Sequence, residues 1–387
     1  MISQQQANLF VLARQHLTPD SRLEDVVRVA GDIGGLHATN AMTPYLSLWA
    51  RCSGFTRGCL EQELYERRTL ARLRSVRGTI YIYPREFLPI AFAATSASAM
   101  AASRRYMEAL GVPFEQYERV SQDILHLLAG REMSAIAIRR ALQTDAYVPT
   151  VLSTMCDLGL LVRARPNSGW RDAHHSYARF EEYLPGVDLR QYGEEEATVA
   201  LIRQYLRAFG PASEGDIAWW SGFTRSRVRT ALRALETEVR QVQLERSEQP
   251  CWLLGEDVEG LQQARAIGPP VVNLLPNLDP YLMGYRERAR WLDEARTPWI
   301  FDRAGNATST ILVDGRAAGV WDVAPAGEPA ISVFLFEEPP PELLELVTEQ
   351  ARRLGHFILE REASVRRVPG MVPLPQRNAG GFMSPLR

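Results

Sequence analysis

Three stretches of this chain repeat one order of structure, in which helices are followed by a short β-hairpin. In each stretch, apolar residues first recur at helical spacing, and the sequence then becomes rich in alternating β-branched and aromatic residues. The hairpin-like segments cover residues 70–84, 160–183 and 239–254. This order is typical of winged helices, so the sequence predicts three of them in tandem, without strict sequence repetition.

The character of the chain changes after Gly268-Pro269-Pro270. Strand-like runs at 271–276 and 331–336 flank a hairpin over 309–321, whose Asp314-Gly315 pair is a strong turn signal. Helices are expected over 279–290 and 342–354. We therefore expect an α+β protein, mainly α. Its units would be a winged helix with the candidate catalytic turn at 1–115, a second at 116–190, a third at 191–265, and a β-rich, barrel-like domain at 266–387.

Composition is that of an ordinary globular protein, with 46% hydrophobic and 23% charged residues in a chain of 387. No apolar run is long enough to cross a bilayer, and the first six residues lack the cationic start of a signal peptide. We expect a cytoplasmic protein with no membrane partner. The four cysteines are scattered without a Cys-x-x-Cys pair, so we expect reduced thiols, no metal and no cofactor.

The chain contains no lysine, so all 44 of its basic side chains are arginines. Codon bias in a GC-rich genome accounts for such a composition, but the chemical consequence holds whatever the cause. No side chain can form a Schiff base, which leaves only the amine of Met1, and a phosphate-binding loop that requires lysine is impossible. Pyridoxal enzymes, most aldolases, P-loop nucleotidases and lysine-dependent strand-cleaving lyases are therefore disfavoured.

The formal net charge of −2 conceals a strongly cationic segment. Residues 51–85 carry eight arginines and three glutamates, whereas acidic residues gather at 181–196 and 337–349. Such segregation predicts one basic face, which is typical of a protein that binds nucleic acid. Arginines that only solvate helix surfaces would give the same count, so this alternative stays open.

Residues 34–40 form a glycine-rich polar turn ahead of a helix that begins near Pro44. Two glycines free the backbone, and His37, Thr39 and Asn40 follow. A turn of this kind can present side chains to a ligand. The alternative is that such residues bond only to their own loop backbone, which is common for a histidine among small polar residues.

Five groups of segments occur in order along nearly the whole chain. They are Gly35-Leu36-His37-Ala38-Thr39; Val76-Arg77-Gly78-Thr79-Ile80-Tyr81; Tyr205-Leu206-Arg207-Ala208-Phe209-Gly210-Pro211-Ala212 with Trp219-Trp220-Ser221-Gly222; Leu275-Pro276-Asn277-Leu278-Asp279-Pro280-Tyr281-Leu282-Met283-Gly284-Tyr285-Arg286; and Val313-Asp314-Gly315-Arg316 with Gly319-Val320-Trp321. Together they resemble the AlkZ/YcaQ family of winged-helix DNA glycosylases. The resemblance implies three tandem winged helices and a C-terminal β-rich domain in a C-shaped body. It also implies excision of N-alkylated purines and, in some members, unhooking of interstrand crosslinks.

The family's catalytic signature is Gln-x-Gln or Gln-x-Asp, where this chain has His37-Ala38-Thr39. The resemblance assigns His37 and Thr39 to positioning or activating water, with Asn40 as a further catalytic candidate. A neutral histidine can replace the first glutamine in hydrogen bonding and can accept a proton, whereas threonine orients water without the charge of an aspartate. The turn at 303–309 is small and polar, whereas family members tend to have bulkier residues there.

Eight arginines are candidate DNA contacts. Three are expected to bind phosphates near the catalytic turn and five to bind further out: Arg51, Arg74 and Arg77, then Arg163, Arg165, Arg225, Arg227 and Arg316. A surface ion pair is the alternative for each. Trp219-Trp220 could stack on bases, but such a pair within a helix is more often core. We expect Asp279 and Tyr281 to be structural supports, and we assign no metal to His174-His175.

These features predict a monofunctional DNA glycosylase that acts as a monomer. A purine alkylated at N7 is already cationic and leaves without a strong general acid. Because lysine is absent, water must be the nucleophile, and an intact abasic site would remain. The expected substrate is double-stranded DNA with N7- or N3-alkylated purines, including bulky genotoxin adducts or interstrand crosslinks, in repair or self-resistance. The alternative is a non-catalytic DNA-binding protein that sequesters lesions or regulates; a scaffold for protein partners is disfavoured by the arginines of 51–85.

Overall fold

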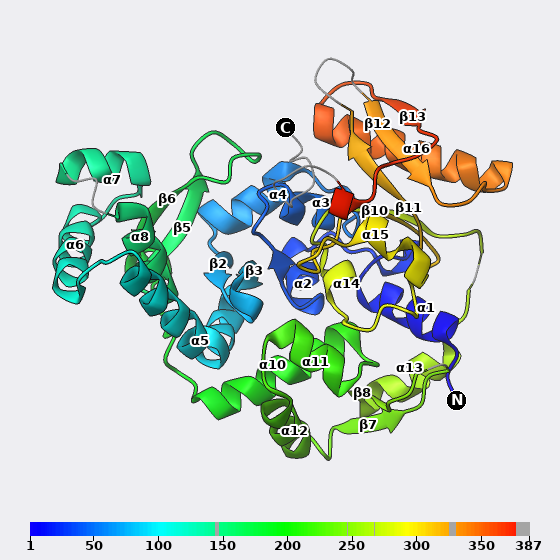
Figure 1. Ribbon diagram of the computed structural model, residues 1–387, viewed down its shortest axis with the longest axis horizontal. Coiled ribbons are helices and arrows are strands. Elements are labelled where there is room, and N and C mark those ends of the chain that lie inside the picture. Colours follow the sequence, from blue (N-terminus) through cyan, green and yellow to red (C-terminus); the bar gives the residue numbers. More distant parts are fainter. Residues whose placement is uncertain (144–146, 246, 267, 325–329, 377–387) are drawn as a thin grey trace.

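The computed structural model describes residues 1–143, 147–245, 247–266, 268–324 and 330–376 (Figure 1). About half of these residues are helical, and their strands form separate small sheets and one larger sheet. The predicted mixture of helices and sheets is confirmed. Within the described part of the chain, no helix is long and apolar enough to cross a membrane.

The N-terminal part contains the first small sheet and the helices before it. Its elements are α1 (Gln4–Arg14), α2 (Val26–Asp32), β1 (Leu36–His37), α3 (Thr43–Trp49), α4 (Arg57–Glu61) with a π-helical turn over Gln62–Glu66, β2 (Leu70–Arg74) and β3 (Ile80–Pro84). Strands β2 and β3 form the predicted antiparallel hairpin, and β1 pairs with the other edge of β3. Tyr81, Ile82 and Tyr83 are all buried, because protein covers both faces of this sheet.

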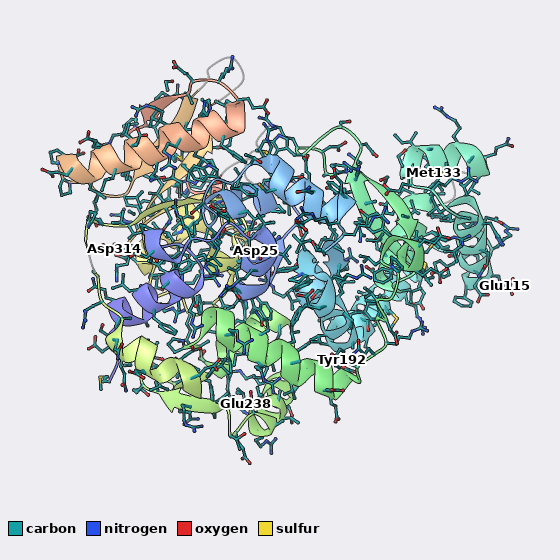
Figure 2. The ribbon with its side chains drawn as sticks, turned by 180° about the vertical axis from the view of Figure 1, so that it is seen from behind. Asp25, Glu115, Met133, Tyr192, Glu238 and Asp314 are labelled. Atoms are coloured by element: carbon teal, nitrogen blue, oxygen red, sulfur yellow. The ribbon has the colours of Figure 1, made fainter. Side chains whose placement is uncertain are left out.

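The next part forms a lobe with its own core. Its elements are α5 (Leu88–Ala109), α6 (Phe114–Leu127), β4 (Met133–Ser134), α7 (Ala135–Leu142), α8 (Val148–Asp157), β5 (Leu161–Pro166), β6 (His175–Arg179) and α9 (Phe180–Tyr183). Ile124, Ile138 and Leu152 pack together at its centre. Figure 1 shows α6 and α7 projecting from the body, and Glu115 and Met133 mark the same lobe from behind in Figure 2.

Capping residues set the helix starts in the third part. Its elements are α10 (Glu194–Phe209), α11 (Glu214–Ser221), α12 (Arg225–Ala234), β7 (Val239–Val242), β8 (Cys251–Leu254) and α13 (Val258–Gln263). The Ser213 hydroxyl accepts from the Asp216 N–H, while the Asp216 carboxylate accepts from the Ser213 N–H, which makes a capping box at α11. The Thr224 hydroxyl accepts from the Arg227 N–H and begins α12.

The C-terminal sheet is open, so the expectation of a barrel-like domain is wrong. Strands β9 (Val272–Leu275), β10 (Thr310–Val313), β11 (Arg316–Val323), β12 (Ala330–Leu335) and β13 (Ser364–Arg367) lie in the order β13-β12-β11-β10-β9. The chain crosses from β12 to β13 through α16 (Pro341–Leu359), which makes this pair parallel. Leu354 and Ile358 of α16 share a core with Ile331 and Val333 of β12. Because this helix covers the apolar face, the strands do not close on themselves.

Between β9 and β10 the chain forms the short helices α14 (Pro280–Met283) and α15 (Thr297–Ile300). The helix expected over 279–290 therefore ends after one turn. At Gly284 a Cβ would lie 2.6 Å from a ring carbon of Phe209, so only glycine lets the chain pass this ring. Beyond it, the Tyr285 hydroxyl donates to the Phe209 carbonyl at 2.8 Å, which holds this segment on α10.

The hydrophobic cores contain residues from more than one of the units predicted from the sequence. One core contains Val11, Tyr205 and Tyr281, and another contains Leu46 and Ile331. Helix α1 packs on α10 and α13. The lobe has a core of its own, which includes Met107 and Val112 of the predicted first unit. The division into units at 115, 190 and 265, the number of winged helices and the C shape stay predictions.

Candidate active site

Two glycines shape the turn between α2 and β1. Their φ angles are +77° at Gly34 and +97° at Gly35, in a region that L side chains rarely adopt. A Cβ on Gly35 would overlap the ring of Tyr83, and one on Gly34 would lie 3.2 Å from a ring carbon of Phe209. The turn therefore fits between β3 and α10 because it has no side chains, and it directs His37 along β3.

His37 is buried against β3, with 3% of its surface exposed. It pairs with Tyr81 across the antiparallel strands, and the two ring centroids are 5.0 Å apart. Burial first, and the charge of Arg77 second, lower the pKa of His37 to about 3. The backbone N–H of Thr39 approaches Nδ1 at 3.5 Å, which assigns the proton of the neutral ring to Nε2.

This state of His37 determines what the ring can do. At pH 7 the imidazole is neutral, and its Nε2–H is a hydrogen-bond donor. A group with so low a pKa is a weak base, because general bases work best when their pKa is near the operating pH. Its neutral state therefore suits His37 to donating a hydrogen bond rather than to accepting a proton.

Thr39 is the exposed member of the turn. Its hydroxyl oxygen accepts from the Ile80 N–H at 3.4 Å, and the neighbouring Ala38 N–H donates to the Ile80 carbonyl at 2.7 Å. The hydroxyl hydrogen of Thr39 is thus available to a ligand. The Asn40 side-chain oxygen accepts from the Met42 N–H at 2.9 Å, so this oxygen serves the loop itself.

Helix α3 anchors the turn to the segment after β9. The Thr43 hydroxyl donates to the Asn277 carbonyl at 2.9 Å, and the Ser47 hydroxyl donates to Asp279 at 2.7 Å. Arg51 makes a bidentate pair with Asp279 at 2.8 and 2.7 Å, and both side chains are 0% exposed. The prediction that Arg51 contacts DNA is therefore wrong, because its guanidinium is enclosed and used in the core.

The other predicted DNA contacts beyond Arg77 fall into two groups. Three are engaged within the protein: Arg74 with Asp157 at 3.0 Å, Arg163 with Ser153 at 3.3 Å, and Arg227 with Glu194 at 2.7 Å. Three are exposed, namely Arg165, Arg225 and Arg316, and of these Arg165 also pairs with Glu66 at 3.8 Å. The engaged arginines connect neighbouring helices and strands, which the sequence could not show. The exposed ones stay predictions as phosphate contacts.

Arg77 belongs to a cationic cluster that the sequence revealed only in part. Its Cζ lies 4.1 Å from the ring centroid of Trp219, and the Cζ of Arg288 lies 5.4 Å from the same centroid. Arg288 also lies over Phe301, at 3.5 Å. Neither guanidinium forms an ion pair with a residue in the described ranges, and Nε of Arg288 is buried without a partner. Burial and then the charge of Arg77 lower the pKa of Arg288 to about 10.

The small polar turn at 303–309 reaches the same cluster. Gly305 has a φ of +80°, and a Cβ there would lie 3.6 Å from a terminal nitrogen of Arg288 and 3.9 Å from Trp219. Gly222 ends α11 beside the backbone of Arg77. Three segments far apart in the chain therefore meet next to the His37 turn.

A family comparison decides the class of the protein. The family model described as DNA glycosylase AlkZ-like matches residues 30–357. The chain belongs to this family. It is thus an enzyme of the DNA glycosylase class, as the sequence predicts. The match to the AlkZ-like model contains both the His37 turn and the Arg77–Trp219–Arg288 cluster.

Among solved structures, this AlkZ-like chain is similar to the DNA glycosylase AlkZ of Streptomyces sahachiroi. The TM-score is 0.78 at 19% sequence identity, over 95% of this chain and 99% of that chain. At this identity the similarity shows a common fold. No curated protein gives a significant match.

Two further predictions concern residues outside the catalytic turn. Asp279 supports α3 as described, and the Tyr281 hydroxyl donates to the Gly315 carbonyl at 3.0 Å, so both act as structural supports. For His174-His175 the sequence predicts no metal. Burial and then the charge of Arg72 lower the pKa of His175 to about 3. Among the residues that the structure describes, no cluster of His, Cys, Asp and Glu could hold a metal ion.

Proposed function

We propose that this AlkZ-like glycosylase hydrolyses the N-glycosidic bond of N7- or N3-alkylated purines in duplex DNA and leaves the strand intact. The observation that carries the proposal is the position of Arg77 and Arg288 around Trp219, beside the turn that contains the buried His37 and exposes Thr39. A glycosylase must hold a polyanionic duplex against its catalytic turn. Two guanidinium groups without carboxylate partners supply that attraction.

Hydrolysis of such a lesion requires little chemical assistance from the protein. Water attacks C1′, the bond from C1′ to the purine nitrogen breaks, and the electron pair leaves with the purine, which becomes neutral when it was alkylated at N7. The water loses a proton to solvent, and an abasic sugar remains. Because the leaving group is already cationic, no strong acid is needed. Without lysine, no side-chain amine can cleave the strand through an imine.

Thr39 and His37 have complementary parts in this proposal. The Thr39 hydroxyl, oriented by the Ile80 N–H, holds the attacking water. The Nε2–H of His37 donates to the same water or to an acceptor on the lesion. Asn40 shapes the loop between them and is the weaker catalytic candidate. Neither His37 nor Thr39 brings a negative charge, so the departing base contributes most of the driving force.

The size of the lesion is a further part of the proposal. Thr39 is exposed, which favours capture of a lesion at the surface over full insertion of the base into a tight pocket. Bulky genotoxin adducts and interstrand crosslinks are lesions of that kind, and a role in repair or self-resistance follows. We propose that a cytoplasmic monomer with three winged helices in a C-shaped body presents this surface, with Arg165, Arg225 and Arg316 as outer phosphate contacts.

A direct assay tests the proposal. The protein is incubated with a duplex that contains a single 7-methylguanine, and then with larger N7 adducts, and the free base and the alkali-labile sites are measured. We expect both products in equal amounts and no strand break before alkali. Thr39→Val should slow release by about 10- to 100-fold with unchanged duplex affinity, while Thr230→Val, an exposed threonine on α12, should have no effect.

A non-catalytic DNA-binding protein is the second candidate function. The burial of His37 and the lack of both signature glutamines favour it. In that case the protein would retard the damaged duplex in a gel, and no base would be released from any adduct. This outcome would exclude the catalytic proposal.

A further inference from the structure

A second basic site lies at the opposite end of α3 from the catalytic turn. Here a pocket of about 330 Å³ opens between Arg22, which follows α1, and Arg353 of α16. Trp49 and Phe55 form its aromatic wall. The volume is several times the roughly 30 Å³ that one water molecule occupies in the liquid, so the pocket can hold a small organic group as well as an ion.

The two arginines face this pocket without a counter-charge. Within the described residues neither forms an ion pair, and Nε of Arg22 is buried without a hydrogen-bond partner. After burial, the positive charge of Arg353 is the next cause that lowers the pKa of Arg22. No aspartate or glutamate is among the described residues that line the pocket. Two like charges held together in this way are stabilised when an anion lies between them.

Other arginines near the pocket have acidic partners. Arg352, next to Arg353 in sequence, pairs with Glu349 on the same helix. Arg57 pairs with Glu360 just beyond the helix end. Acidic side chains are therefore available on this part of the protein, and they pair with other arginines, whereas neither Arg22 nor Arg353 has an ion-pair partner among the described residues.

We propose that this pocket binds a phosphate group. Arg22 and Arg353 supply charge-assisted hydrogen bonds from two sides, and Ser53 and Gln350 add neutral hydrogen-bonding groups on the lining. The aromatic wall suits the organic part that carries the phosphate, such as a sugar or base. The phosphate belongs to the backbone of bound DNA or to a free phosphorylated compound. The inference depends on neither the His37 turn nor the proposed glycosylase reaction.

Calorimetric titration of the full-length protein with inorganic phosphate, in a buffer free of other multivalent anions, tests the proposal. We expect saturable binding at one site. Arg22→Gln and Arg353→Gln should each weaken it by about tenfold or more, because each removes a charge-assisted hydrogen bond. Arg352→Gln, which makes the same charge change one residue away, should bind phosphate like the wild type. Melting temperatures without phosphate establish that each variant is folded.

Two further measurements separate the sources of the phosphate. If the site holds DNA backbone, both pocket variants weaken binding to an undamaged duplex and inorganic phosphate competes with that duplex. If the site holds a free compound, duplex affinity is unchanged and phosphate binds equally with duplex present. Lack of saturable phosphate binding, or an equal loss in Arg352→Gln, would overturn the proposal. Release of 7-methylguanine by the same variants is a separate readout, so failure of the pocket and failure of the glycosylase are distinguishable.

Discussion

The guanidinium of Arg77 stacks on the indole of Trp219, with 4.1 Å between Cζ and the ring centroid. Arg77 sits in the turn between β2 and β3 with a positive φ of 53°, whereas Trp219 belongs to α11. The same arginine also contributes, after burial, to the low pKa of His37. One side chain thus connects two distant segments of the chain at the catalytic turn and adds to the effect of burial, which keeps the imidazole neutral.

Arg77→Gln is expected to weaken duplex binding. If Arg77 contacts one phosphate, the slope of the logarithm of the binding constant against the logarithm of salt concentration should fall by about one. Titrations of labelled duplex at several salt concentrations measure this slope. Arg352→Gln is the matched control, because that arginine is already paired with Glu349 and should leave the slope unchanged. An unaltered slope in Arg77→Gln would place its charge outside the DNA interface.

Replacement of His37 tests the donor role. His37→Gln keeps an N–H donor and should retain base release within about tenfold, whereas His37→Phe, which has a ring of similar shape and no donor, should lose about 100-fold. Single-turnover release from 7-methylguanine duplex measures both. Because the pKa of His37 is about 3, the wild-type rate should show no step near pH 6.5. A change in the rate of base release near pH 6.5 that disappears in His37→Gln would contradict the role of His37 as a neutral donor.

The buried imidazole also makes stability depend on pH. The folded-state pKa of about 3 lies below the ordinary value of 6.5, so the unfolded chain takes up the proton first as the pH falls. Stability should therefore be lost below about pH 6.5, with a contribution from His37 of about 2 kcal/mol between pH 7 and pH 5. Urea unfolding at the two pH values measures this loss. The loss of unfolding free energy between pH 7 and pH 5 should be smaller by about 2 kcal/mol in His37→Gln. An equal loss in both proteins would refute the low pKa of His37.

The pair of Arg51 and Asp279 should dominate the stability of the frame behind the turn. Arg51→Met leaves a buried carboxylate without its partner and should lower the free energy of unfolding by about 3–5 kcal/mol. The control is Arg203→Met, which breaks the exposed pair with Glu238 and should cost less than about 1 kcal/mol. Urea unfolding compares the two. Similar costs for both variants would mean that burial of the first pair has no energetic consequence.

Gly35→Ala should displace the catalytic turn. Its added Cβ meets the ring of Tyr83 in addition to the strain of a positive φ, so we expect a loss of more than about 1 kcal/mol and slower base release. Gly54 also has a positive φ, of +62°, but nothing lies within 4 Å of an added Cβ. Gly54→Ala should therefore show the backbone strain alone and normal release. Equal effects would mean that the close approach to Tyr83 is unimportant.

Local signals in the sequence account for much of the fold. Alternating residues define the β2–β3 hairpin, and Ser213 and Thr224 begin their helices because side-chain capping acts over three residues. The sequence does not predict the open C-terminal sheet, because its form does not depend on local signals. Whether a strand closes a barrel or joins in parallel through a helix depends on packing across the domain, which no local pattern records.

The candidate site also contains residues that the sequence reveals and residues that it does not. The glycine turn and His37 could be recognised from adjacent residues, and so could Arg77 beside them. The enclosure of Arg51 could not, because its partner Asp279 is 228 positions away. Arg288 lies two residues beyond the recognised segment that ends at Arg286, and its place beside Trp219 depends on how that segment passes Phe209. A charge in a sequence does not reveal whether it faces water or a partner.

Polar side chains of α1 and of Gln15, which caps its end, bond to backbone that is synthesised much later. Gln15 donates to the carbonyl of Ala208, 193 positions on, and Asn8 donates to that of Arg290, 282 positions on. Val11 and Leu12 share their core with Tyr205 and Tyr281, which are also synthesised later. A nascent chain therefore keeps α1 without these bonds until residue 290 has emerged, and the frame behind the His37 turn is completed only after that point.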